Sequence, residues 1–185
     1  TLALGTAGKI IQVNSGATAL EFTDPPQGIA EADMWRLNTS FANSVNGANE
    51  VLTSNWERND TNFDKIGTGM TESSGYFSFP KTGIWLIEFT ATCWYADYAR
   101  RFVYAAMQVT VNNSSYDRRT EGYANFTDLS SDAHYLSCHC SYIFDVTSTT
   151  NCKLYFQGIA DGAVNWMGTT NSNQTYATFI RLGDT

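Results

Sequence analysis

The chain has 185 residues, a formal net charge of −7 and an isoelectric point near 4.6. Affinity for nucleic acid and for anionic membranes comes largely from Lys and Arg, so this charge disfavours both as partners. Aromatic residues make up 14% and charged residues 16% of the chain, and Asn, Ser, Thr and Gly separate the apolar runs. This composition favours an all-β domain over a helical one.

The first 24 residues differ from the rest of the chain. Two short apolar runs, Lys9 to Val13 and Ala19 to Phe22, lie among small residues and glycines, and neither run is long enough to bury itself. The stretch PPQG that follows breaks the pattern and indicates a linker. We therefore expect a linker segment over residues 1–29 and one domain over residues 30–185. No run of about 18 apolar residues occurs, so no membrane insertion is expected.

The first part of the domain contains one stretch with an ambiguous pattern, followed by two stretches with the clear alternation of β-strands. The stretch EADMWRLNTSFANSV has a helix-like spacing, but Asn and Thr are poor helix formers, so we expect an extended strand. Two alternating runs then meet at a Pro-Lys-Thr-Gly corner, residues 80–83. One face of the second run is wholly apolar: Trp85, Ile87, Phe89, Ala91 and Cys93. Its other face includes Ile84 and Leu86, which predicts a strand covered on both sides.

The later strands complete the pattern. The run FVYAAMQVTV ends in Asn112 and Asn113, which tolerate left-handed turn geometry, so it predicts a hairpin with the following SSYDRRTEGYANF. HYLSCHCSYIFDV, CKLYFQG and TYATFIRLGDT alternate in the same way. Roughly eight to ten short strands bounded by turn residues predict an antiparallel two-sheet jelly-roll sandwich. The corner at residues 80–83 would carry the chain from one sheet to the other.

The four cysteines do not predict a metal centre. Four are too few for a dense disulfide framework, and Cys138 and Cys140 are separated by one residue, whereas structural zinc sites use two to four. The remaining two are Cys93 and Cys152. We expect buried, unpaired thiols, with no metal and no cofactor.

Signatures of an enzyme are nearly absent. There are two histidines and no nucleophile elbow, phosphate-binding loop or zinc-protease helix. A glycosidase-like pair of carboxylates stays possible among five loop residues: Asp60, Asp64, Glu72, Asp97 and Asp128. Their scatter favours solvated surface charges, and no regular calcium-binding loop occurs. We expect a protein without catalytic activity.

Two loops are candidates for receptor binding, because aromatic rings and Arg side chains serve sugar and protein recognition. The candidate residues are Trp94, Tyr95, Tyr98, Arg100 and Arg101 in CWYADYARRF, and Trp166 in GAVNWMGTTNSNQ. The alternative is that Trp94 and Tyr95 complete the core. By contrast, Arg118 and Arg119 lie beside Asp117 and Glu121 and predict a solvated, salt-bridging face.

The order of these motifs resembles the trimeric jelly rolls of the tumour necrosis factor (TNF) and complement globular-head superfamily. GYFSFPKTGIWLIEFTA is similar to that family's aromatic strand, Pro-x-x-Gly turn and following strand, MQVTVNN to its apolar strand ending in Asn, and YATFIRLGDT to its closing strand. The resemblance covers residues 30–185. It implies a homotrimer, in which the inner sheet of each subunit packs about a threefold axis. The implied interface residues are Ile84, Leu86, Tyr135, His139, Ile143, Ala177 and Phe179, with Trp85, Ile87 and Phe89 in the core.

The N-terminal stretch LGTAGKIIQVNSGATALEF resembles linker repeats in tail-fibre and appendage proteins of bacteriophages, although only one repeat is visible and no collagen-like run precedes the domain. This second resemblance implies a phage fibre knob on the virion surface, joined to an upstream fibre shaft. As a homotrimer it would attach to a glycan or protein receptor on the host. The alternatives are a secreted cytokine-like or complement-like signalling domain, a purely structural virion decoration, and a hydrolase of host polysaccharide.

Overall fold

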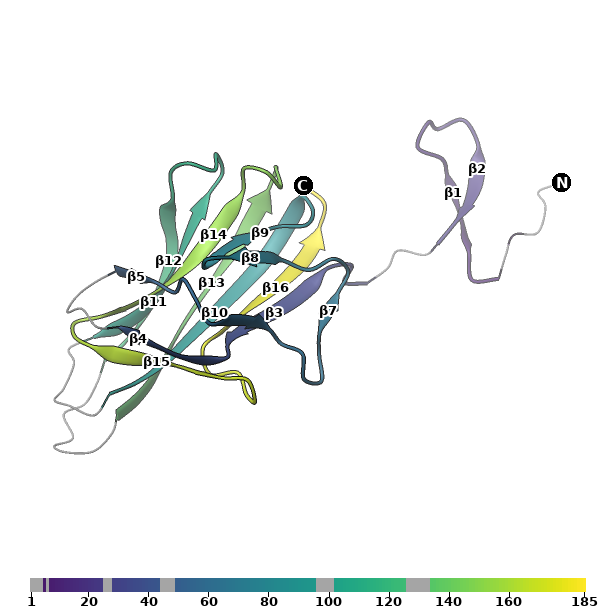
Figure 1. Ribbon diagram of the computed structural model, residues 1–185. Coiled ribbons are helices and arrows are strands. Elements are labelled where there is room, and N and C mark those ends of the chain that lie inside the picture. Colours follow the sequence, from purple (N-terminus) through teal and green to yellow (C-terminus); the bar gives the residue numbers. More distant parts are fainter. Residues whose placement is uncertain (1–4, 6, 25–27, 44–48, 96–101, 126–133) are drawn as a thin grey trace. The chain divides into compact units, whose positions relative to one another are not determined.

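The computed structural model describes residues 5, 7–24, 28–43, 49–95, 102–125 and 134–185 (Figure 1). The chain divides into two units, Thr1–Ala30 and Glu31–Thr185. All regular elements in the described residues are β-strands. Accordingly, no helix there is long and apolar enough to cross a membrane.

The first unit contains a two-stranded antiparallel hairpin. Strand β1 (Ile10–Val13) pairs with β2 (Leu20–Thr23), and Asn14 Oδ1 accepts a hydrogen bond from the Thr18 amide at 2.9 Å across the turn. The register places Ile11 opposite Phe22 and Val13 opposite Leu20, which puts four apolar side chains on one face. All four of these residues are exposed in the described chain.

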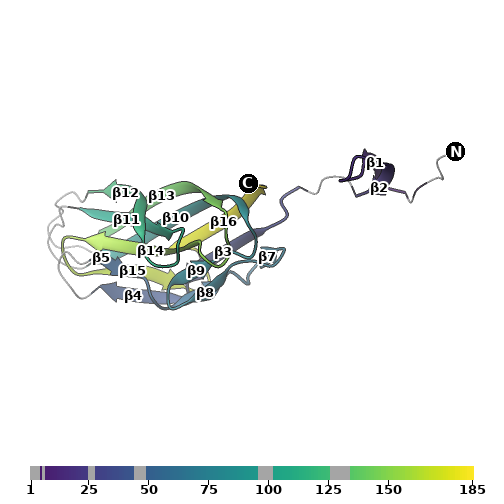
Figure 2. The ribbon, with the colours of Figure 1, turned by 90° about the horizontal axis from the view of Figure 1, so that it is seen from above.

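The second unit is a sandwich of two antiparallel sheets. The sheet that we call the inner sheet has eight strands: β3 (Ala32–Leu37), β4 (Thr39–Asn43), β6 (Trp56–Arg58), β7 (Lys65–Ile66), β10 (Gly83–Tyr95), β13 (His134–Val146), β15 (Val164–Thr169) and β16 (Tyr176–Gly183). The outer sheet has six: β5 (Asn49–Val51), β8 (Thr71–Ser73), β9 (Tyr76–Ser78), β11 (Val103–Thr110), β12 (Asp117–Ala124) and β14 (Lys153–Ala160). Figure 2 shows the same sandwich turned by 90°.

The strand order is that of a jelly roll. The inner sheet runs β13, β10, β16, β3, β6, with β15 joining the end of β10 to β4, and the outer sheet runs β12, β11, β14, β9, β8. This confirms the predicted all-β, antiparallel two-sheet fold. The corner at residues 80–83 carries the chain from β9 in the outer sheet to β10 in the inner sheet, as predicted. The predicted hairpin is β11–β12, and Asn113 in its turn has the left-handed φ of 56°.

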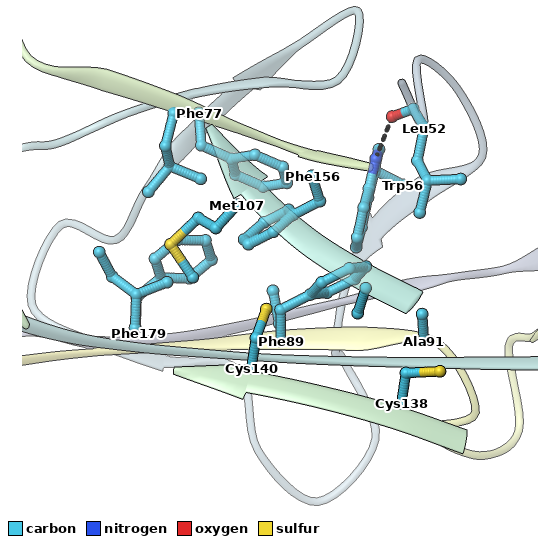
Figure 3. Packing of buried hydrophobic residues seen from close by; sticks show 14 of the residues in the cluster. Leu52, Trp56, Phe77, Phe89, Ala91, Met107, Cys138, Cys140, Phe156 and Phe179 are labelled. Carbon is cyan, nitrogen blue, oxygen red and sulfur yellow. Dashed lines mark hydrogen bonds between the residues drawn. The ribbon is translucent and has the colours of Figure 1, made fainter. Parts of the chain in front are cut away.

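The core fills the space between the sheets with aromatic rings (Figure 3). The wholly apolar face of β10 is buried along its whole length, which confirms the alternation seen in the sequence. Phe89 stacks on Phe156 of the outer sheet at 4.4 Å between ring centroids, and Phe77 meets Trp56 edge to face at 5.2 Å. The Trp56 indole donates its hydrogen bond to the Leu52 carbonyl at 2.7 Å. Burial of these rings contributes strongly to the hydrophobic stabilisation of the fold.

Buried ion pairs and hydrogen bonds connect strand β3 to strand β6 and to the residues just before β8. The Asp33 carboxylate accepts hydrogen bonds from the Met70 amide at 2.6 Å and the Trp35 indole at 2.9 Å, and it forms an ion pair with Arg58 at 3.0 Å. Nearby, Glu31 forms an ion pair with Lys81 at 2.7 Å. Burial acts to raise the pKa of Glu31, but this ion pair and two backbone amides outweigh it and lower the pKa.

Candidate functional site

The outward face of the inner sheet brings together five of the seven predicted interface residues. Ile84 and Leu86 lie on β10, and Tyr135, His139 and Ile143 lie on β13. The two strands pair so that Leu86 is opposite Ile143. Since side chains alternate along a strand, all five project from the same face. Their role between subunits stays a prediction.

One end of this face is apolar and open to solvent. Leu86 lies between Ile143 on β13 and Ile180 on β16 in the strand register, which forms a row of aliphatic side chains across three strands. Ile143 is 59% exposed. We call Leu86, Ile143 and Ile180 the aliphatic row. A row of this kind on a sheet face favours contact with another protein surface.

The middle of the face is polar. Thr90 Oγ1 lies 3.2 Å from Nδ1 of His139, and the hydroxyl groups of Thr92 and Ser137 are 2.7 Å apart. Glu88 lies opposite Ser141 in the register. The prediction that the strand is apolar on both faces is therefore correct at the aliphatic row and wrong at the centre of the sheet.

Two predicted interface residues were assigned to the wrong face. Ala177 and Phe179 are fully buried in the core, where they lie opposite Phe89 and Ile87 of β10. Both alternating sets of β16 contain apolar residues, so the sequence did not reveal which set points inward. The outward positions of this strand are instead held by Tyr176, Thr178 and Ile180.

Comparisons with known proteins bear on this architecture. No protein-family model and no curated protein matches the sequence. Among solved structures, Eiger TNF from S. frugiperda is similar, with 12% identity and a TM-score of 0.60 over 83% of this chain and 93% of that chain. Murine APRIL is similar with 11% identity and a TM-score of 0.55 over 82% of this chain and 98% of that chain. The fold is a TNF-like jelly roll.

The sequence analysis assigned the predicted receptor-binding residues to two loops, but in the structure Trp94 and Tyr95 lie at the end of strand β10. Trp94 is half-buried on the outward face of the inner sheet, opposite Tyr135. Tyr95 is buried and stacks on His134 at 5.0 Å between ring centroids. The remaining residues of that loop, Tyr98, Arg100 and Arg101, lie outside the described residues. The alternative that Trp94 and Tyr95 both complete the core is therefore correct for Tyr95 and wrong for Trp94, which lies on the outward face.

Trp166 is also a core residue, which corrects its assignment to a surface loop. It lies on β15, is fully buried, and covers the backbone of Gly158 on β14 in the outer sheet. Its indole ring occupies the space that a Cβ on residue 158 would need. Trp166 thus fills the space between the two sheets and is not available to a receptor.

All four cysteines are buried and free of disulfides, as predicted. Cys138 and Cys140 point into the core, opposite Ala91 and Phe89 of β10 (Figure 3). Burial raises the pKa of Cys93 and Cys140 to about 12 and that of Cys138 to about 11. In the parts of the chain that the structure describes, no group of three or more His, Cys, Asp or Glu could hold a metal ion. The thiols therefore act as small apolar side chains.

The outward face of the outer sheet carries a tyrosine cluster that the sequence analysis missed. Arg118 and Arg119 form the predicted ion pairs, with Glu121 and Asp117 respectively, each at 3.0 Å. The tyrosines around them come from four separate stretches of sequence: Tyr76, Tyr104, Tyr116, Tyr123 and Tyr155. Only the pairing of β12, β11, β14 and β9 brings them to one surface. The available sequence signal was tyrosine at outward positions of these alternating strands.

Proposed function

We propose that this protein is a binding domain without catalytic activity that works as a homotrimer. The aliphatic row on the inner sheet carries this proposal, because Leu86, Ile143 and Ile180 form an apolar strip across three strands of a TNF-like jelly roll. Two further copies of the chain would remove this strip from water. The resemblance of the sequence to trimeric jelly rolls supports the same arrangement. In a trimer, three receptor sites would raise the overall affinity through effective concentration.

The oligomeric state tests this proposal directly. Light scattering at micromolar concentration should give a mass three times the 20.5 kDa of one chain. Obligate interfaces are large and apolar and therefore persist at this dilution. A mass of one chain would refute the trimer.

For its biological setting, we propose attachment of a virion to its host, with the domain as the knob of a phage fibre. The N-terminal segment supports this setting in two ways. Its sequence resembles phage fibre linkers, and its hairpin exposes Ile11, Val13, Leu20 and Phe22 on one face. An isolated hairpin is marginally stable in water, so a partner such as the fibre shaft would stabilise it. In this setting the protein lies outside the cell, on the virion surface.

A second setting is a secreted cytokine-like or complement-like signalling domain. The similarity to Eiger TNF and to murine APRIL favours this alternative. In both settings the protein is an extracellular trimer that binds a receptor. A purely structural decoration of the virion would share the trimer but bind no host surface.

Measuring how the purified chain affects adsorption of the parent virus distinguishes the fibre knob from the other two settings. If the protein is a fibre knob, the purified chain should occupy the host receptor and block adsorption in proportion to its concentration. A trimer that leaves adsorption unchanged at saturating concentration would exclude the fibre-knob setting. A virion that lacks residues 30–185 and still adsorbs would indicate a purely structural role.

A further inference from the structure

Half of the chain's ten tyrosines gather on the outward face of the outer sheet. We call Tyr76, Tyr104, Tyr116, Tyr123 and Tyr155, together with Arg118, the tyrosine surface. Tyr and Arg are among the residues most enriched at recognition surfaces, and the rigid ring of Tyr offers contact area at low entropic cost.

Three of the tyrosines form one packed group. The ring centroids of Tyr76 and Tyr155 are 5.2 Å apart, those of Tyr116 and Tyr155 are 5.0 Å apart, and those of Tyr76 and Tyr116 are 5.7 Å apart. Burial raises the pKa of Tyr116 and of Tyr155, so both phenols keep their protons at neutral pH. Tyr76 is the most open member of the group, at 38% exposed. The group therefore offers a preorganised ring together with neutral hydroxyl donors.

The other two tyrosines form a stacked pair. The rings of Tyr104 and Tyr123 lie 4.6 Å apart with an interplanar angle of 29°. Tyr104 is the buried member of the pair, whereas Tyr123 is 59% exposed. The Tyr123 hydroxyl donates a hydrogen bond to Glu121 Oε1 at 2.9 Å, which fixes the Tyr123 ring in place. Since Tyr104 covers one face of the Tyr123 ring, the exposed area belongs to the other face and the edge.

Arg118 connects the two groups of rings. Its guanidinium lies 5.3 Å from the centroid of the Tyr104 ring and donates hydrogen bonds to the Tyr104 hydroxyl at 3.3 Å and to Glu121 at 3.0 Å. In the register Arg118 is opposite Gln108, and Gln108 is opposite Tyr155. Guanidinium, carboxamide and phenol groups therefore form a row across three strands, and in the register this row ends beside Tyr76, which is opposite Tyr155.

The chemistry of this surface differs from that of the inner sheet. Among the described residues of the outer-sheet strands, the large apolar residues that are exposed are Tyr76 and Tyr123, and no exposed Leu or Ile occurs there. A protein partner generally needs a desolvated apolar centre, such as the aliphatic row provides. A pyranose ring has an apolar face of C–H groups and a rim of hydroxyls, which matches open aromatic faces beside fixed polar groups.

We propose that the tyrosine surface binds an oligosaccharide, with pyranose rings stacked on Tyr76 and Tyr123 and hydroxyl groups hydrogen-bonded to the row of Arg118, Gln108 and Tyr155 on the same surface. The proposal rests on the proposed function, because it names the class of receptor that the binding domain recognises. It places that receptor on the outer sheet and away from the face proposed for trimer contacts. Trimerisation and sugar binding are therefore separate properties of the same chain.

Affinity electrophoresis with a polysaccharide panel tests the proposal. The probes are two neutral polymers, dextran and mannan, and two acidic ones, polygalacturonate and hyaluronate, each cast into a native gel. The full chain should be retarded by at least one of them. Tyr76→Ala and Tyr123→Ala should each weaken that retardation by about tenfold, since an aromatic contact contributes on the order of one factor of ten in affinity. Tyr123→Phe, which keeps the ring, should remain within about threefold of the parent chain.

Val111→Ala is the matched control, because Val111 is also 59% exposed and follows β11 of the same sheet. It should leave retardation unchanged. No retardation by any of the four polymers, or equal retardation of the parent chain and both Tyr→Ala variants, would overturn the proposal. Light scattering on the same samples distinguishes a failure of sugar binding from a failure of the proposed trimer. A trimer without retardation rejects sugar binding alone, whereas a monomer rejects the proposed function.

Discussion

The backbone carbonyl of His139 on β13 occupies the place that a Cβ of residue 122 on β12 would need, so the two sheets meet at Gly122. The two strands belong to different sheets, and this approach closes one side of the sandwich. A side chain at residue 122 would have to push the strands apart. The position requires glycine because of the close backbone, and not because of its own dihedral angles.

Gly122→Ala should therefore lower the free energy of unfolding by about 1–3 kcal/mol, the usual cost of overpacking a tight site. Chemical denaturation followed by Trp fluorescence would measure the loss. Gly183→Ala is the control, because no atom beyond its two chain neighbours lies within 4 Å of its added methyl group. Equal stability of the two variants would show that the strands are not in close contact here.

Ile143→Asp should weaken the proposed trimer, because it places three carboxylates within an apolar interface. Light scattering should then give a lower average mass than for the parent chain at the same concentration. Val111→Asp introduces the same charge at a residue with the same exposure of 59%, but on the outer sheet. It should remain a trimer. Loss of the trimer in both variants would point to a general effect of charge.

Asp33→Ala should cost about 3–5 kcal/mol of stability, because removing one partner of a buried ion pair leaves the Arg58 charge and the Met70 amide poorly satisfied. Asp60→Ala should cost less than about 1 kcal/mol. Asp60 also pairs with an arginine, Arg36 at 3.1 Å, but its side chain is 76% exposed. Urea unfolding of the two variants compares the loss of a buried carboxylate with the loss of an exposed one, and similar losses would contradict the burial of Asp33.

The buried thiols predict a loss of stability in alkali. Their pKa values are raised to about 11 or 12 by burial, from an ordinary value of 9.0. Above pH 9 the unfolded chain loses these protons while the folded chain keeps them, so the free energy of unfolding falls as pH rises toward 11 or 12. Below pH 9 both states are protonated and this contribution is constant. Each thiol contributes up to about 1.4 kcal/mol per pH unit in that window.

Urea midpoints at pH 8 and pH 10.5 under reducing conditions would measure this effect. Within each variant the quantity compared is the difference between the two pH values, so that any cavity created by the substitution cancels. Cys138→Ala and Cys140→Ala should each show a smaller loss between the two pH values than the parent chain. An unchanged loss would assign the alkaline effect to other groups, such as tyrosine or lysine.

The sequence by itself determined the fold class and much of the core. The period of two in β10 is a local property, so the set from Trp85 to Cys93 could be placed on one face without knowing its neighbours, and the resemblance to trimeric jelly rolls then implied that this face is the core. The corner at residues 80–83 and the turn at Asn113 follow from the restricted or permissive backbones of Pro, Gly and Asn. The burial of the four thiols follows from their positions in apolar, alternating stretches.

Tertiary structure alone decided which face each ambiguous strand presents and which distant residues meet. On β16 both alternating sets contain apolar residues, and only the register with β10 places Phe179 inward and Ile180 outward. Trp166 lies in a polar stretch but is buried, because β15 crosses over Gly158. The tyrosine surface spans residues 76 to 155 and forms through long-range strand pairing. A local pattern fixes the alternation of a strand, whereas its register depends on partners elsewhere in the chain.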